Sequence, residues 1–263
     1  MSWFKALFRP KADENAGAAM SVAEPCYAMG DVHGRLDLFE RMLAALKADW
    51  AASGRSECPV LYCLGDLVDR GTQSKGVVEA FLALQQQDWC QARLLMGNHE
   101  EAMLQFMAEP EFGPTWITYG GAQTLLSYGV TPPPVGSDAV AWAEASRAFS
   151  RAVPEAHKQL FQTSPDMIRN GDYVFVHAGV RPGVPLDSQS AADFRWIRRD
   201  FLDCDKACDG VVVHGHTPTD DVENLPWRIG LDTGAYASGV LSAVRLIEAE
   251  RKIIKVGLAG VLS

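Results

Sequence analysis

Short apolar segments recur along the chain, and each one ends at a glycine or a polar residue. They cover residues 25–29, 59–64, 92–96, 172–176 and 210–213. Apolar runs of this length, most of them rich in β-branched or aromatic residues and bounded by such breaks, are typical of buried β-strands. We therefore predict five strands, each followed by a loop that carries polar side chains.

Helical patterns lie between the first three of these segments. In residues 35–50, and again in 74–87, apolar side chains recur every three or four positions, which places them on one face of a helix. Alternation of strands with such helices favours parallel pairing through right-handed crossovers. Residues 100–165 differ, because helical patterns broken by prolines fill most of this stretch. We predict a helical insert there, beside the functional site.

The last third of the chain reads as consecutive strands, at residues 228–232, 239–248 and 252–258. We expect these strands to form a second sheet rich in hairpins. The chain is therefore predicted to have an α/β fold with two sheets and a helical insert. Its 263 residues fit one domain, residues 22–263, after a flexible leader at residues 1–21.

The leader begins M-S-W-F-K-A-L-F-R-P-K, and its apolar stretch is too short and too interrupted by charge for a secretory signal. The alternative to a disordered leader is a small membrane-surface anchor built from its aromatic and basic residues. The chain contains no apolar run of about 18 residues or more, so we expect no membrane span.

Charge and cysteine content narrow the function. The formal net charge is −9 and the pI is about 5.1. No cluster of Lys and Arg supplies the basic face of a nucleic-acid-binding protein, so no nucleic-acid partner is expected. An acidic enzyme that acts on phosphate must create positive potential locally, through metal ions and a few arginines. The six cysteines show no paired framework, which indicates a reducing, cytoplasmic environment.

Polar residues with metal-binding side chains follow the predicted strands, and five of the six histidines are among them. The candidate ligands are Asp31, His33, Asp66, Asn98, His177 and His216. Because ligands collect at the carboxyl ends of strands in α/β sheets, these side chains are expected to converge on one point. Mixed oxygen and nitrogen ligands without thiolate suit Mn, Fe or Zn.

The spacing of these residues fits two ions. Asp31 and His33 can reach one ion, and Asp66 can bridge two ions through its two carboxylate oxygens. Asn98, with the two later histidines His177 and His216, would complete the second. Two ions about 3.5–4 Å apart stabilise the attacking and leaving oxygens of an in-line displacement and generate hydroxide near neutral pH.

These motifs together resemble the phosphoprotein phosphatase family of the calcineurin-like metallophosphoesterase superfamily, and especially its bacterial serine/threonine branch. The matching strings are G-D-V-H-G (30–34), G-D-L-V-D-R-G (65–71), G-N-H-E (97–100), H-A-G (177–179) and G-H-T (215–217). Two smaller matches are G-G-A-Q-T-L-L-S-Y-G (120–129) and L-D-T-G-A (231–235). A proline commonly follows D-R-G in the family, whereas this chain has Thr72.

The resemblance implies a two-sheet β-sandwich flanked by helices, and two divalent ions held as described above, with Mn²⁺ as the first choice. It implies that His99 is the general acid, oriented by Asp69. It also implies that Arg70, Asn98 and Arg198 hold the substrate phosphate. For Arg198, the other interpretation is a solvated charged face in F-R-W-I-R-R-D.

The activity implied by the resemblance is hydrolysis of phosphoserine and phosphothreonine in proteins, and in bacterial relatives of phosphotyrosine and small phosphoesters, by direct attack of metal-bound hydroxide. The first alternative is a symmetrical dinucleoside tetraphosphate hydrolase. That relative typically reads V-A-R-G and G-N-H-D, so Asp69 and Glu100 favour the protein phosphatase. The second alternative is a phosphopeptide-binding module without catalysis, which the complete ligand set disfavours.

Overall fold

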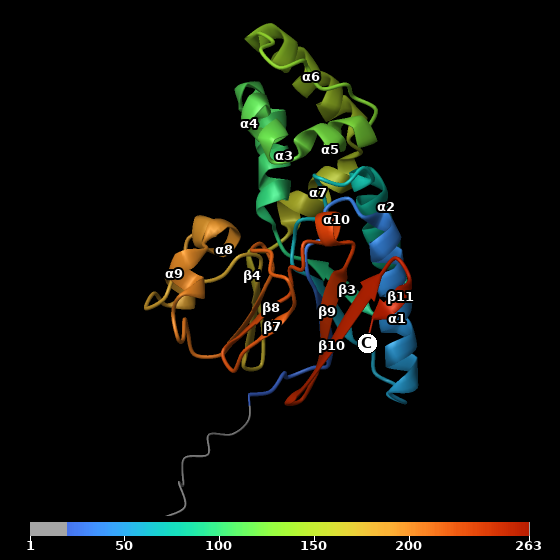
Figure 1. Ribbon diagram of the computed structural model, residues 1–263, viewed down its shortest axis with the longest axis vertical. Helices are drawn as coiled ribbons and strands as arrows, with labels where there is room; N and C mark the ends of the chain where they lie inside the picture. Colours follow the sequence, from blue (N-terminus) through green and yellow to red (C-terminus); the bar gives the residue numbers. More distant parts are fainter. Residues whose placement is uncertain (1–19, 263) are drawn as a thin grey trace, which may run out of the picture.

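Two β-sheets pack face to face in the computed structural model, which describes residues 20–262 (Figure 1). The first sheet has the order β11 (Gly260–Leu262), β10 (Glu250–Gly257), β9 (Leu241–Ile247), β1 (Cys26–Met29), β2 (Val60–Cys63), β3 (Gln91–Leu94). The second has the order β4 (Met167–Asn170), β5 (Tyr173–Val176), β6 (Val211–His214), β8 (Arg228–Gly230), β7 (Glu223–Asn224). The predicted strands are thus confirmed.

Helices cover the outer faces of the sandwich. On the first sheet lie α1 (Leu36–Ala52) and α2 (Ser74–Leu84). On the second lie α8 (Ala191–Trp196) and α9 (Arg199–Leu202). A 3-10 turn, η2 (Leu186–Ser188), precedes α8, and the short helix α10 (Ala235–Ser238) precedes β9. The predicted α/β sandwich flanked by helices is confirmed.

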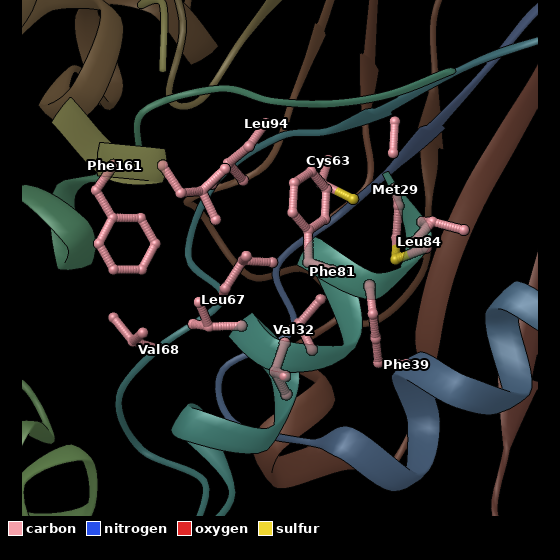
Figure 2. Packing of buried hydrophobic residues seen from close by; sticks show 14 of the residues in the cluster. Met29, Val32, Phe39, Cys63, Leu67, Val68, Phe81, Leu84, Leu94 and Phe161 are labelled. Atoms are coloured by element: carbon pink, nitrogen blue, oxygen red, sulfur yellow. The ribbon is translucent and has the colours of Figure 1, made fainter. Parts of the chain in front are cut away.

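Alternation along each strand explains this layering. In β1, Cys26 and Ala28 join the core between the sheets, whereas Tyr27 and Met29 face α1 and α2. Successive side chains of a strand point to opposite faces, so a strand buried on both sides reads as a continuous apolar run. Figure 2 shows the outer core, where Met29 packs with Phe39 of α1 and Phe81 of α2.

Parallel pairing is also confirmed for the strands that precede the site. β1 pairs in parallel with β2, and β2 with β3. In the second sheet, β5, β6 and β8 are parallel, and antiparallel strands lie at its two edges. The carboxyl ends of the strands of each parallel set therefore meet at one edge of its sheet.

The hairpin expected in the second sheet lies in the first one instead, and this prediction was wrong. β9 pairs antiparallel with β1, and β10 and β11 extend the sheet beyond it. Only 228–232 joins the second sheet, as β8. The reason is that β1 pairs with β2 on one side only, and its buried N–H and C=O groups on the other side need partners, which β9 supplies.

Residues 100–165 form the predicted helical insert. Its elements are α3 (Asn98–Ala108), η1 (Pro110–Phe112), α4 (Gly113–Thr118), α5 (Gly121–Ser127), α6 (Ala139–Ala152) and α7 (Glu155–Thr163). Phe106 packs with Trp116 and Phe149 at its centre, with ring centroids 5.0 and 6.1 Å away. These rings belong to the same core as α1 and α2, so the insert is packed firmly beside the first sheet.

The remaining predictions concern the leader, the cysteines and a membrane span. Most of the predicted leader lies outside the described residues, but Ser21 donates its backbone N–H to Asp172 (2.9 Å). All six cysteines lie within the described part of the chain and are free, as predicted. No helix among residues 20–262 is long and apolar enough to cross a membrane.

Candidate metal centre

The predicted ligands come together at the carboxyl ends of the strands. Asp31 and His33 follow β1, Asp66 follows β2, Asn98 begins α3 after β3, His177 follows β5, and His216 follows β6. All six side chains are buried. The loops of both sheets therefore contribute to one cluster, as the sequence predicted.

The carboxylate of Asp66 is the centre of this cluster. Its Oδ2 lies 3.5 Å from His33 Nε2, 3.4 Å from His177 Nε2 and 3.8 Å from His99 Nε2. Two groups of side chains with ligand spacing share it, namely His33, Asp66 and His99, and Asp66, His177 and His216. A single carboxylate that reaches both groups is in the position expected of a bridging ligand.

Asn98 joins the second group. Its Oδ1 lies 2.8 Å from His177 Nε2 and 2.9 Å from His216 Nδ1, and these two nitrogens are 3.2 Å apart. His177 Nδ1 is 2.8 Å from the Leu64 carbonyl, to which it donates its proton, so His177 Nε2 carries a lone pair. That lone pair faces the carbonyl oxygen of Asn98. A cation between these atoms would turn the repulsion into coordination.

His33 is held in the same way as His177, through a backbone carbonyl. Its Nδ1 donates to the Val68 carbonyl (2.8 Å), so the Nε2 lone pair points into the cluster. Nε2 is buried without a hydrogen-bond partner, although it faces Asp66 and, at 4.0 Å, Asp31. Burial lowers the pKa of His33 to about 3, so the ring is neutral at pH 7. A lone pair that faces two carboxylates fits a divalent cation.

A further buried acid, to which the sequence analysis gave no role, lies near Asp31. Asp232 follows β8, and its Oδ2 is buried without a hydrogen-bond partner. Burial, with the charges of Asp232 and Asp66, raises the pKa of Asp31 well above its usual range. Ions bound here would offset this concentration of negative charge. The motif L-D-T-G could have revealed Asp232 in the sequence, because it places an acid at the end of another strand.

Backbone strain is concentrated in the same loops. The non-glycine residues with positive φ near the cluster are His33 (46°), Asp66 (54°), Asp69 (71°), Arg70 (65°) and His216 (67°). Among the described residues the sole further case is Glu248, outside the site. Left-handed conformations are costly for residues with a side chain and occur at functional sites when surrounding contacts enforce them.

The carboxylate of Glu100 is one of those contacts. Its Oε2 accepts the N–H of Asp66 (2.8 Å), and its Oε1 accepts the N–H groups of Leu67 (2.8 Å) and Val68 (3.3 Å). A Cβ atom at Gly97 would collide with the carboxylates of both Asp66 and Glu100, so only glycine fits there. α3 is thus locked against the loop that carries Asp66.

His99 and Asp69 form the predicted pair. His99 Nδ1 donates to Asp69 Oδ2 (2.7 Å), and the helical insert holds the same carboxylate through Trp116 Nε1 (2.9 Å) and Thr124 Oγ1 (2.6 Å). Burial lowers the pKa of His99, but the carboxylates of Asp66 and Asp69 outweigh this and raise it above the ordinary value. The role of the insert in holding Asp69 was missed, because the sequence does not show which side chains reach across from it.

Arg70 lies beside this pair. Its Nη2 is 3.2 Å from His99 Nε2, and its guanidinium stacks on the ring of Tyr236, 4.6 Å from the centroid. Although His99 has ligand spacing to His33 and Asp66, a neighbouring guanidinium opposes a metal ion on its Nε2. We therefore keep Asp31 rather than His99 as the candidate ligand.

Arg198 lies on the other side of the cluster. Its Nη1 donates to the carbonyl of His216 (3.3 Å) and to Thr217 Oγ1 (3.2 Å). Arg195 is engaged elsewhere, with Asp166 and Glu101, and Arg199 begins the exposed start of α9. Arg198 is itself exposed but lies next to a candidate ligand, and its role at the phosphate stays a prediction.

The remaining histidines lie outside both ligand groups. His214 packs edge-on against Phe201 with ring centroids 5.0 Å apart, and its Nδ1 contacts the Gly215 carbonyl. His157 accepts or donates a hydrogen bond with Tyr128 (2.8 Å) inside the insert. Neither contributes to the cluster around Asp66.

Comparison with known proteins identifies the family. A family model described as calcineurin-like phosphoesterase matches residues 25–232. The chain is 24% identical over 245 residues to the bis(5'-nucleosyl)-tetraphosphatase PrpE (asymmetrical) of Anoxybacillus flavithermus, covering 84% of this chain and 90% of that protein. It is 25% identical to the protein of the same name from Bacillus subtilis, covering 84% and 91%.

Solved structures show the same fold. A protein described as a candidate diadenosine tetraphosphatase superposes with a TM-score of 0.61 and 21% identity, over 91% of this chain and 98% of that one. A cold-active protein tyrosine phosphatase superposes with a TM-score of 0.53 and 18% identity, over 88% of this chain and 78% of that one. Both likenesses concern the fold alone.

Changing Asp66 to Asn tests its central position. Asn tolerates the left-handed backbone of this residue and can still accept the N–H of His99, so the variant should fold. Loss of the charge should lower the bound metal, measured by elemental analysis, and abolish hydrolysis. The matched control is Asp88→Asn, an exposed change before β3 that should alter neither quantity. Normal metal content with normal turnover in Asp66→Asn would rule out the shared-ligand assignment.

A second prediction compares Arg198 with its neighbour Arg199. If Arg198 holds the substrate phosphate, as predicted, Arg198→Ala removes a charge-assisted contact and kcat/KM should fall about tenfold to a hundredfold. Arg199→Ala, one position along, should change kcat/KM less than about twofold, the usual scale for a surface change, because its guanidinium makes no hydrogen bond or ion pair among residues 20–262, unlike that of Arg198. The reverse order of effects would place the phosphate contact on Arg199.

Proposed function

This chain belongs to the calcineurin-like phosphoesterase family, and we propose that it is a metal-dependent hydrolase of phosphate esters or anhydrides. The observation that carries the proposal is the set of buried lone pairs, on His33, Asn98 and His177, that face one another around Asp66. Such an arrangement is unfavourable without cations and well suited to two of them.

The proposed ligands follow from this geometry. Asp31, His33 and Asp66 would hold one divalent ion. Asp66, Asn98, His177 and His216 would hold the other. When bound, the ions would neutralise charge on the substrate phosphate and lower the pKa of water. The ligand types suit Mn²⁺, with Fe or Zn as alternatives.

The protein's own groups supply the rest of the chemistry. Arg70, Arg198 and Asn98 would bind phosphate oxygens, and phosphate would draw Arg70 away from His99 Nε2. His99 would then give the proton on Nε2 to the leaving oxygen as the phosphorus–oxygen bond breaks. Asp69 would stabilise the protonated ring and keep it aimed through Nδ1.

For the substrate we propose a dinucleoside tetraphosphate. The support is that relatives covering 84% of this chain carry the name bis(5'-nucleosyl)-tetraphosphatase. This favours the nucleotide alternative over the phosphoprotein substrate that the motifs first suggested. Those relatives are named asymmetrical, so the expected products of diadenosine tetraphosphate are ATP and AMP, whereas symmetrical cleavage would give two ADP.

A phosphomonoester of serine or threonine is the second candidate, and the His99–Asp69 pair favours it. An alkoxide is a poor leaving group and needs a proton from a general acid. A nucleotide phosphate leaves as a stable anion and needs that proton much less. The pair is buried and held by four contacts, to Asp66, Arg70, Trp116 and Thr124.

A parallel turnover panel tests the substrate. Diadenosine tetraphosphate, phosphoserine and phosphotyrosine peptides and a cyclic nucleotide are each supplied with Mn²⁺, and products are separated by chromatography. We expect the highest kcat/KM for the tetraphosphate, with ATP and AMP as products. Asp66→Asn, prepared identically, controls for contaminating phosphatases. A higher kcat/KM for phosphoserine peptide would replace our proposal by the phosphatase.

His99→Asn tests the general acid. On phosphoserine peptide the variant should lose about 10²–10⁴ in kcat, the usual range for acid catalysis. On 4-nitrophenyl phosphate, which departs as a stable phenolate, the loss should be distinctly smaller. The measurement is the ratio of the two losses at saturating Mn²⁺. Asp69→Asn should give a milder loss of the same shape, because Asp69 acts only through His99. Equal losses on both esters would mean that His99 positions water or metal instead.

A further inference from the structure

Three aromatic side chains form a continuous row beside the ligand cluster, which Trp196 meets at His216 and Tyr119 meets at His99. Trp196, the last residue of α8, lies edge-on to His216, with ring centroids 6.3 Å apart and planes at 80°. Tyr119, just after α4, is 6.1 Å from Trp196, and Phe112 of η1 is 6.4 Å from Tyr119. We call Phe112, Tyr119 and Trp196 the aromatic row.

The row lies at the edge of the first core, against which Phe112 and Tyr119 pack, and ends at an exposed ring. Trp196 is 37% exposed, and Tyr119 and Phe112 are half-buried. The three residues come from two parts of the chain, the insert and α8, which meet beside the cluster. The exposed ring of Trp196, beside buried polar groups, offers a large apolar contact area to a ligand.

Trp196 is also fixed in place. Its indole N–H donates to Glu101 Oε2 (2.5 Å), and the other oxygen of Glu101 accepts from Arg195 (2.7 Å). Arg195 is held in turn by Asp166 (2.6 Å). The ring therefore has little freedom to turn away from the cluster. A surface residue fixed before the ligand arrives loses little entropy on binding.

The aromatic residue on the opposite side of the cluster is used differently. Tyr236 lies edge-on to His33 (5.5 Å), but the guanidinium of Arg70 already covers its face. Tyr236 thus supports an arginine. Among residues 20–262, no cationic side chain is stacked on Trp196 in this way, and its face is the better platform for a ligand.

We propose that the aromatic row is the subsite for a planar aromatic group attached to the substrate phosphate, with Trp196 as its main platform. The proposal rests on the proposed function for the position of that phosphate beside His216 and Arg198. The bases of a dinucleoside tetraphosphate and the ring of an aryl phosphate share this chemistry. Stacking on one aromatic side chain typically changes affinity about 5- to 100-fold.

The test compares substrates with and without an aromatic group. For Trp196→Leu, we expect kcat/KM to fall about 5- to 100-fold, mainly through KM, on at least one aromatic substrate. The aromatic substrates are diadenosine tetraphosphate and 4-nitrophenyl phosphate. Turnover of β-glycerophosphate, which has no ring, should change less than about twofold. A loss confined to the tetraphosphate identifies a nucleobase, and a loss on the nitrophenyl ester identifies an aryl group.

Three further variants sharpen the result. Trp196→Phe keeps an aromatic face and should recover part of the affinity. Tyr119→Leu should give a smaller loss with the same substrate pattern, and it replaces Trp196→Leu if that variant does not fold. Trp89→Leu is the matched control, because Trp89 is half-buried before β3, at the opposite end of the strand from the site. It should leave all three substrates unchanged.

Two outcomes would overturn the subsite. One is an equal loss on all three substrates, which would mean general damage to the centre, and the other is no loss on any. Both are distinct from failure of the proposed substrate. If the wild type does not hydrolyse the tetraphosphate, the nucleotide proposal fails, yet the comparison of nitrophenyl and glycerol esters still decides whether the row binds a ring.

Discussion

The contact between Glu100 and the loop after β2 sets the geometry of the rest of the site. Glu100 accepts three consecutive backbone N–H groups, so Asp66 keeps a left-handed backbone and turns its carboxylate into the cluster. Without this acceptor the N–H groups would be buried and unpaired, at a cost of about 1–3 kcal/mol each. Because Glu100 follows Asn98 and His99 on α3, one contact fixes how far Asp66 lies from Asn98, a proposed ligand of the second ion, and from His99, the proposed general acid.

The helical insert fixes the orientation of His99, as Glu100 fixes that of Asp66. Trp116 and Thr124 donate to the two oxygens of Asp69, and Asp69 in turn accepts a hydrogen bond from His99 Nδ1–H. Thr124 Oγ1 also accepts the N–H of Asp69, whose backbone is left-handed. The insert therefore supports the candidate site without contacting a phosphate. With His99 as the proposed general acid, a change in the aromatic core around Trp116 would affect the leaving group through Asp69.

Sequence patterns predicted the strands and the polar residues that follow them. They did not predict which strands pair, or which side chains meet from distant parts of the chain. Asp31, Asp66 and His177 were predictable because each follows an apolar strand, and strands of a parallel set end at one edge. The place of β9 was not, because alternation specifies which faces of a strand are buried but not which open edge it joins. The supports of Asp69, and the meeting of Tyr119 with Trp196, join residues far apart in the chain. No short motif contains both members of such a pair.

In the proposed function, the His99–Asp69 pair and the aromatic row would act on different parts of a substrate. The buried groups around Asp66 would hold the metal ions and the phosphate, which every candidate substrate contains. His99 and Asp69, as the proposed acid pair, would act on the leaving oxygen and extend the reaction to alkoxides, which otherwise leave slowly. The proposed subsite at the aromatic row would act on the group attached beyond the phosphate and would favour planar groups. The two proposed roles fall on neighbouring side chains, because the rings of Tyr119 and His99 lie 6.3 Å apart between centroids. Selectivity between nucleotides and phosphopeptides would then depend on the acid pair and the aromatic row together, rather than on the metal ligands.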